Sequence, residues 1–81
     1  MNSYKLSNIP LAIFRNYLIY EGWSKSDQKR RDGHEKWVKG GCLRPVILQT
    51  HIDPIPAVII KSNLRTMGLS RLELLEWLRN K

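Results

Sequence analysis

The chain has 81 residues, and its 14 Lys and Arg outnumber its seven Asp and Glu, which gives a formal net charge of +7. This length fits one small domain over residues 1–81 that buries about 60–65% of its unfolded surface, which excludes a deep pocket around a large cofactor. The basic bias favours a polyanionic partner, with nucleic acid ahead of an acidic protein or a membrane surface, over a domain that is merely basic and soluble.

A first helix is predicted to begin near Asn8, which can cap it, with Pro10 in the first turn, where the missing N–H of proline costs nothing. Its apolar residues recur at helical spacing and are Leu11, Phe14 and Leu18, flanked by Ile13, Tyr17 and Tyr20. Gly22 is typical of the left-handed residue that ends a helix. Trp23 is expected in the core, and a short strand should begin there and give way to a loop before Gly33.

A second strand is predicted over residues 34–39. Its alternation places Trp37, the largest apolar group, on the face that meets the helices. His34 and Lys36 share the other parity, so they should project together from the open face of the sheet.

Gly40 and Gly41 can form a tight turn into a third strand over residues 45–51, which is rich in β-branched and aliphatic residues. The residues of this strand expected to face the core are Val46 and Leu48. His51 falls on the opposite parity, toward the open face.

Two helices should complete the domain. Asp53 is expected to cap the first of them, with prolines following in its first turn. Its apolar stripe consists of Ala57, Ile60, Leu64 and Met67. Gly68 then breaks the helix, and the spacing of Ser70 and Glu73 predicts a capping box that starts the last helix. The apolar residues assigned to this last helix are Leu69 and Leu74 as a hydrophobic staple, and Leu72, Leu75 and Leu78 along its length.

The predicted order is helix, three strands, helix, helix, which is an α+β class with a three-stranded antiparallel sheet and helices on one face. The single cysteine, Cys42, excludes an intrachain disulfide and a thiolate metal cluster within the chain, and it suits a reducing cytoplasm. The N-terminal residues lack the pattern of a signal peptide, and the apolar runs fall far short of the roughly 20 residues of a membrane span. We therefore expect a cytoplasmic protein.

The clearest chemical signal is a run of three cations at residues 29–31, followed by Asp32, Gly33 and then His34. Histidine is the side chain that gains and loses a proton near neutrality, and neighbouring cations gather a polyanion. RNA carries its own nucleophile, the 2′-hydroxyl, so a histidine acting as acid and base beside charge-stabilising cations can cleave it. We therefore predict that His34 is catalytic, with His51 as a weaker candidate. The cations expected to contact RNA phosphates are Lys25, Lys29, Arg30, Arg31 and Lys36.

The sequence holds no paired carboxylates at useful spacing, no glycine-rich phosphate loop and no metal-binding cluster, so we expect cleavage without a metal or a cofactor. Two other functions stay open. A non-catalytic RNA-binding module would use the same basic charge, although phosphate contact alone needs no histidine. A DNA-binding regulator would use the helix-turn-helix rhythm of residues 63–78, although Glu73 and Glu76 suit a phosphate-lined groove poorly.

Four short motifs follow one another along the chain. Residues 20–23 read Tyr-Glu-Gly-Trp, which is a helix end followed by an aromatic residue, and residues 32–34 read Asp-Gly-His. Residues 49–51 read Gln-Thr-His at a strand end, and residues 60–69 form an amphipathic helix that closes in Gly-Leu. This ordered set, which covers nearly the whole chain, resembles the HicA-type mRNA interferase toxins. That family has Gly-Ser-His and Val-Pro-x-His at the two histidine motifs.

The resemblance implies a double-stranded-RNA-binding-domain-like fold and the role of a toxin in a toxin–antitoxin pair. Such a toxin would cleave mRNA as a metal-independent endoribonuclease with His34 as its catalytic residue, and a cognate HicB-type antitoxin protein would cover that face. His51 is expected to be a hydrogen-bonded residue at a strand end rather than to take a direct part.

Overall fold

The computed structural model of the chain describes residues 9–27 and 33–80. Its elements follow in the order α1 (Leu11–Tyr20), β1 (Ser24–Lys25), β2 (His34–Val38), β3 (Val46–Gln49), α2 (Ala57–Met67) and α3 (Arg71–Asn80). The predicted α+β class and the order of its elements are therefore confirmed. None of the helices in this part of the chain combines the length and the apolar character needed to cross a bilayer.

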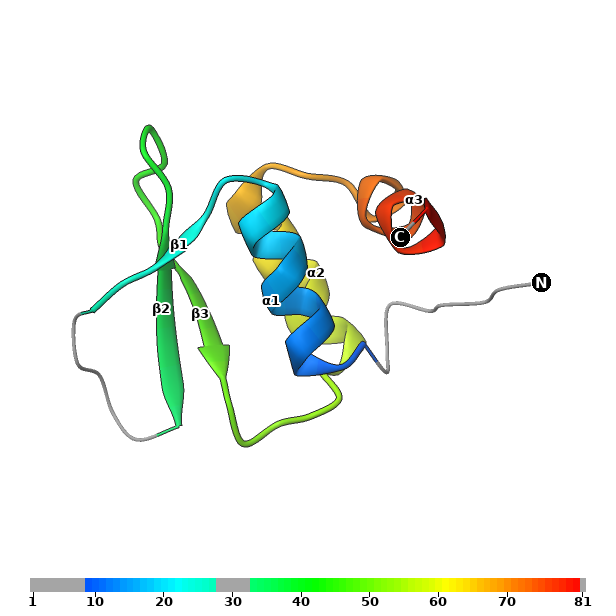
Figure 1. Cartoon of the computed structure of the whole chain (residues 1–81), viewed down its shortest axis with the longest axis horizontal. Coiled ribbons are helices and arrows are strands. Elements are labelled where there is room, and N and C mark those ends of the chain that lie inside the picture. The colour runs from blue at the N-terminus through cyan, green and yellow to red at the C-terminus, as the bar shows by residue number, and fades with distance from the viewer. Residues whose placement is uncertain (1–8, 28–32, 81) are drawn as a thin grey trace.

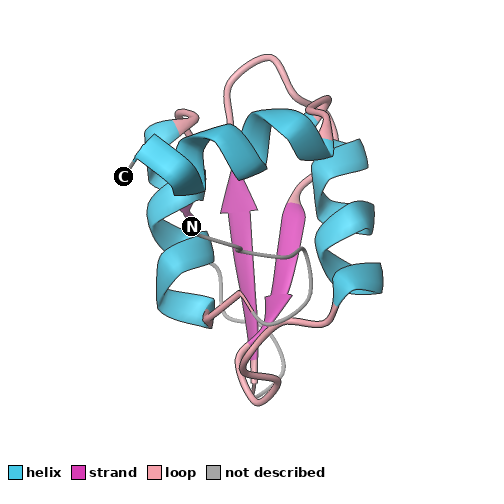
Figure 2. Cartoon of the chain, turned by 90° about the vertical axis from the view of Figure 1, so that its right-hand side faces the viewer, coloured by secondary structure: helices cyan, strands magenta, loops and turns pink. Residues whose placement is uncertain are grey.

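The three strands form an open antiparallel sheet in the order β1-β2-β3. The helices lie to one side of this sheet (Figure 1), and from the helical side the strands are seen behind them (Figure 2). Because successive side chains of a strand point to opposite faces, Trp37, Val46 and Leu48 are buried against the helices. The opposite surface, which we call the open face, carries His34, Lys36 and Val38 of β2 and Ile47 and Gln49 of β3.

The strands are shorter than predicted. β2 stops before Lys39, because the carbonyl of that residue accepts the N–H of Cys42 at 3.0 Å and so begins the hairpin turn. Gly41 has a φ of 87° in this turn, a conformation that glycine adopts without steric cost. β3 excludes Pro45, which has no N–H to donate. It also ends before His51, which lies in the turn after the strand.

The hydrophobic core lies between the sheet and the helices. Its buried apolar side chains are Ile9, Leu11, Phe14, Tyr17, Leu18, Trp23, Trp37, Val46, Leu48, Ile55, Ile60, Leu64, Leu74 and Leu78. The predicted burial of Trp23 is therefore confirmed. Of the leucines expected along the last helix, Leu78 is buried, whereas Leu72 is 70% exposed. α3 presents Leu74 and Leu78 to the core, one turn apart, which leaves Leu72 on its other side.

Asp53 caps a different helix from the one predicted. Its Oδ1 accepts the backbone N–H of Leu11 at 2.9 Å, so it caps α1 rather than α2. α2 instead begins after Pro56 without a side-chain cap. Beside this contact, the N–H of Ile55 donates to the carbonyl of Ile9 at 2.8 Å. The predicted cap Asn8 lies outside the described residues. The segment between β3 and α2 thus closes the N-terminal end of α1.

The connection between α2 and α3 forms as predicted. Gly68 ends α2 in the left-handed conformation, with a φ of 74°. The N–H of Ser70 donates to Glu73 Oε2 at 2.6 Å, and the N–H of Glu73 donates to Ser70 Oγ at 3.2 Å. The capping box is therefore confirmed, because it depends only on residues within one turn of each other.

Candidate functional site

β2 is held to α1 through Glu35, which lies on the helical side of the strand. Its carboxylate accepts hydrogen bonds from Arg15 Nη2 at 2.6 Å, from Arg15 Nε at 3.1 Å and from Trp37 Nε1 at 3.1 Å. Burial alone would raise the pKa of Glu35. The hydrogen bonds from Arg15 and Trp37 and the charges of Arg15 and Lys25 outweigh burial, so this pKa lies below its ordinary value. The ionised carboxylate therefore fixes the orientation of β2, and with it the side chains on the open face.

The open face places His34 and Lys36 two residues apart on one strand, as predicted. Across the strands, His34 is the partner of Gln49, and Lys36 is the partner of Ile47. Directly opposed residues of paired strands project to the same side, so these four side chains are neighbours. Neither His34 nor Lys36 is buried in the core.

Lys25 does not join this group. It is the cross-strand partner of Trp37, so its side chain projects to the helical side of the sheet. There its Nζ lies 3.8 Å from Glu35 Oε2, in an ion pair whose lysine is exposed and whose carboxylate is largely buried. Of the five cations expected to contact RNA, the structure brings Lys36 beside His34 and separates Lys25 from it. The other three, Lys29, Arg30 and Arg31, lie outside the described residues.

The two histidines lie side by side, although they belong to different elements. The ring centroids of His34 and His51 are 6.5 Å apart, with an angle of 70° between the rings. The turn carrying His51 is held to the start of β2, because the N–H of Thr50 donates to the carbonyl of Gly33 at 2.7 Å. The sequence places both histidines on the same parity but gives no measure of how close they are.

Gly33 makes this approach possible. A Cβ atom built on it would lie 3.2 Å from His51 Nδ1, which is closer than nearly all real contacts of this kind. The same residue has a φ of 84°, in the region that side chains disfavour. Glycine before His34 therefore serves two needs, the backbone turn into β2 and the space for the second imidazole.

Within the described residues, His34 Nδ1 is buried and has no hydrogen-bond partner. Most buried polar atoms in folded proteins are paired with protein or water, so an unpaired ring nitrogen calls for an explanation. Here the same ring lies at a half-exposed position on the open face.

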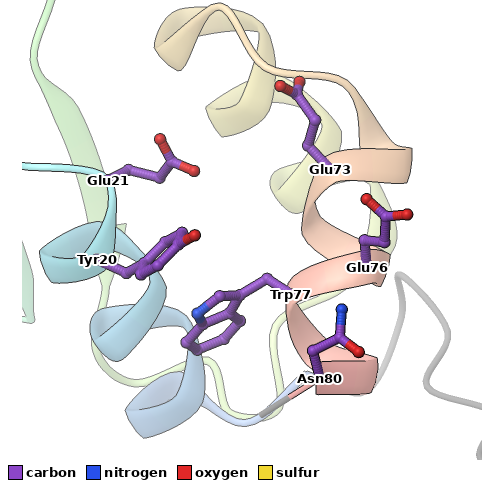
Figure 3. Close-up of a pocket in the computed structure, with 6 residues that line it drawn as sticks. All are labelled: Tyr20, Glu21, Glu73, Glu76, Trp77 and Asn80. Atoms are coloured by element: carbon purple, nitrogen blue, oxygen red, sulfur yellow. The ribbon is translucent and has the colours of Figure 1, made fainter.

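A second group of titratable side chains lines a cleft of about 270 Å³ between the end of α1 and α3 (Figure 3). Its lining residues are Tyr20, Glu21, Glu73, Glu76, Trp77 and Asn80. Tyr17 lies behind it, with its ring 5.0 Å from that of Trp77. Burial and the nearby carboxylates of Glu21 and Glu73 raise the pKa of the Tyr17 phenol. The sequence does not reveal this cleft, because its acidic residues lie just after α1 and on α3, which only the fold brings together.

A second hollow, of about 530 Å³, lies between the β2–β3 hairpin and the end of α2. Arg44 and Arg65 are among its lining residues, together with Cys42. Among residues 9–27 and 33–80, no three His, Cys, Asp or Glu side chains gather as they would around a metal ion. The histidine pair is the group within these residues best suited to proton transfer, because an imidazole ring can both accept and donate a proton.

The comparisons with known proteins give no relative. No protein-family model matches the chain, and no curated protein or solved structure matches it significantly. Function has to be argued from the side chains themselves.

Proposed function

We propose that this chain is a metal-independent endoribonuclease in which His34 is the catalytic acid and base. The observation that supports this most is the position of His34, which lies on the open face beside Lys36 rather than in the core. A histidine packed for stability alone would be expected with its ring nitrogens paired, whereas His34 Nδ1 has no partner in the described part of the chain.

RNA cleavage requires few catalytic groups from the protein, because the substrate supplies the nucleophile. An imidazole removes the proton of the ribose 2′-hydroxyl, and the oxygen attacks the adjacent phosphorus. A cation such as Lys36 stabilises the charge on the phosphorane oxygens. The P–O5′ bond then breaks as an imidazolium gives a proton to O5′, leaving a 2′,3′-cyclic phosphate and a 5′-hydroxyl. No step of this sequence needs a metal ion or a cofactor.

The biological role we infer is that of a HicA-type mRNA interferase toxin in the cytoplasm. The run from α1 through the three strands to α2, with helices on one side of an antiparallel sheet, suits a double-stranded-RNA-binding-domain-like fold with α3 appended. Its partners would be mRNA and a HicB-type antitoxin protein that covers the open face. Such an antitoxin would present an acidic or RNA-like surface to a chain of net charge +7, so salt should slow their association.

The same fold could bind RNA without cleaving it, and this is the second function that the open face supports. A helix-turn-helix role is less well supported, because Glu73 and Glu76 of α3 lie in the acidic cleft. Phosphates would be repelled from the helix that would have to enter a DNA groove.

The test is an RNA cleavage assay with the purified chain in excess chelator, followed by analysis of the product ends. We expect cleavage to persist, with 2′,3′-cyclic phosphate and 5′-hydroxyl termini. Asn16→Ala, a change at an exposed position of α1, serves as a control and should cleave like the parent. Activity that disappears in chelator and returns with Mg²⁺ would overturn the mechanism, and binding without cleavage would favour the RNA-binding module.

A further inference from the structure

His51 comes to His34 through three features of the backbone. β3 pairs with β2 so that Gln49 lies opposite His34, which puts the end of β3 at the start of β2. The Thr50 N–H then bonds to the Gly33 carbonyl and extends this pairing into the turn. Gly33 finally leaves the space that His51 occupies.

The resulting pair is not explained by packing. His51 is exposed, so its ring adds little to the core. The two rings are 6.5 Å apart between centroids, which is close enough for nitrogens of both to reach one small group, since each hydrogen bond spans about 2.6–3.2 Å. A phosphodiester presents two oxygens that need proton transfer during cleavage, one entering and one leaving.

We propose that His51 is a second catalytic residue, which forms an acid–base pair with His34. One neutral imidazole takes the proton of the 2′-hydroxyl as the O2′–P bond forms. The other, as imidazolium, gives a proton to O5′ as the P–O5′ bond breaks. Each turnover exchanges the protonation states of the two rings, and water restores them. This inference rests on the proposed ribonuclease function, and it differs from the expectation that His51 only holds a strand end.

Gly33 is the positioning residue for this pair. An alanine there would crowd His51 Nδ1 at 3.2 Å and would also have to adopt a φ of 84°. The His51 ring would move away, while His34 would stay in β2. Gly33→Ala should therefore resemble loss of His51 rather than loss of His34.

The first experiment compares pH–rate profiles of kcat/KM for the parent, His34→Ala, His51→Ala and His51→Gln. A pair in which one ring must be neutral and the other charged gives the parent a bell-shaped profile. We expect either change at His51 to lower the rate by about 10²–10³-fold and to remove one limb of the bell. Gly33→Ala should lower the rate and distort the same limb. Val38→Ala, on the same face at the other end of β2, should keep both the rate and the bell.

Two further measurements separate a chemical role from a structural one. Affinity for an uncleavable RNA with a 2′-deoxy ribose at the target should stay within about twofold in the His51 variants, because phosphate contacts come from cations. Melting temperatures should match the parent, since an exposed side chain is being changed. His51→Gln keeps a polar side chain in case His51→Ala disturbs the turn.

The sharpest test uses an RNA whose 5′ leaving oxygen is replaced by sulfur. A thiolate leaves without being protonated, so this substrate needs a general base but no general acid. One of the two histidine variants should recover most of its activity on it, and the other should not. If His34→Ala is inactive while His51→Ala keeps the parent rate and a bell-shaped profile, the pair is refuted and the ribonuclease stands. If the parent cleaves neither substrate, both proposals fail.

Discussion

The open face around His34 and the cleft between α1 and α3 both gather titratable side chains from distant segments, but they use them differently. In the cleft, Glu73 is engaged as the cap of α3 through Ser70, and the aromatic rings pack against Tyr17. On the open face, His34 Nδ1 is buried next to His51 with no hydrogen-bond partner among the described residues. The Tyr17 hydroxyl behind the cleft is also buried without a hydrogen-bond partner among these residues, so an unpaired atom does not distinguish the two regions. The difference lies in their chemistry, because the cleft gathers carboxylates beside a phenol whose pKa is raised, whereas the open face gathers two imidazoles, which can exchange protons with a substrate.

The two regions also differ in charge. Three of the seven acidic residues of the chain line the cleft, namely Glu21, Glu73 and Glu76. Carboxylates repel phosphate groups, so a polyanion should favour the open face, where Lys36 lies beside His34, over the cleft.

The largest expected contrast between the regions is in cleavage rate. His34→Ala should lower it by about 10²–10⁴-fold, the usual contribution of a general acid or base. Glu76→Gln, an exposed change in the cleft, should leave it within about twofold. Single-turnover assays on one RNA, with melting temperatures recorded for each variant, make the comparison. A His34→Ala protein that cleaves normally, or fails only because it unfolds, would make His34 structural.

The hydrogen bonds of Glu35, which hold β2 beneath the histidines, should contribute more to the free energy of unfolding than the Ser70–Glu73 capping box beside the cleft. Glu35→Ala removes the acceptor for Arg15 and Trp37 and should lower the free energy of unfolding by about 1–3 kcal/mol. Denaturant titration at neutral pH measures this. The same unfolding free energy for parent and variant would mean that solvent replaces the carboxylate without cost.

This contribution should also depend on pH in a defined direction. The folded pKa of Glu35 is lowered from its ordinary value of 4.5. The stabilisation is therefore complete above that pH and is lost as the pH falls through the lowered folded value. Acid should consequently destabilise the parent more steeply than Glu35→Gln. Parallel acid unfolding curves would show that Glu35 does not contribute to this slope.

On the cleft side, Ser70→Ala removes the hydroxyl that accepts the Glu73 N–H. The cost should be about 1 kcal/mol, or roughly 4–8 °C in melting temperature for a domain of this size. Cleavage by the remaining folded protein should not change, because α3 lies away from the open face (Figure 1). Ser62→Ala, at an exposed position of α2 with no capping role, is the matched control and should melt with the parent.

The smallest contrast concerns RNA affinity. Lys36→Ala should weaken binding of an uncleavable RNA and reduce the slope of log affinity against log salt by about one ion. Lys61→Ala, an exposed cation on α2, makes the same change in net charge away from the open face and should affect the slope less. Equal effects of the two changes would mean that RNA binds by overall charge rather than at the histidine site.

The structural features that could be predicted from the sequence are those that depend on residues close together in the chain. The alternation of β2 places Trp37 in the core and His34 outside it, and the sequence shows that alternation directly. The Ser70–Glu73 capping box was predicted for the same reason, because both partners lie within one helical turn.

What could not be predicted depends on tertiary contacts. Asp53 precedes α2 and has the right chemistry for its cap, but the fold offers it the N–H of Leu11 instead. Leu72 is a large apolar residue of the kind usually found in a core. The rotation of α3 about its own axis is set by the packing of the whole helix, however, and it leaves Leu72 exposed. The approach of His51 to His34 is of the same kind, because it requires the register of two strands and the turn after them.

The cap of α1 makes the order of synthesis matter. α1 has ten residues, too few for a stable helix on its own, and its cap comes from a carboxylate 42 residues later in the chain. A nascent chain that has not yet emerged as far as Asp53 lacks this cap and the pairing of Ile9 with Ile55. Its core side chains on α1 must then stay in contact with water. α1 is therefore secured only after the three strands have been made, because its cap and the pairing partner of Ile9 follow β3 in the chain.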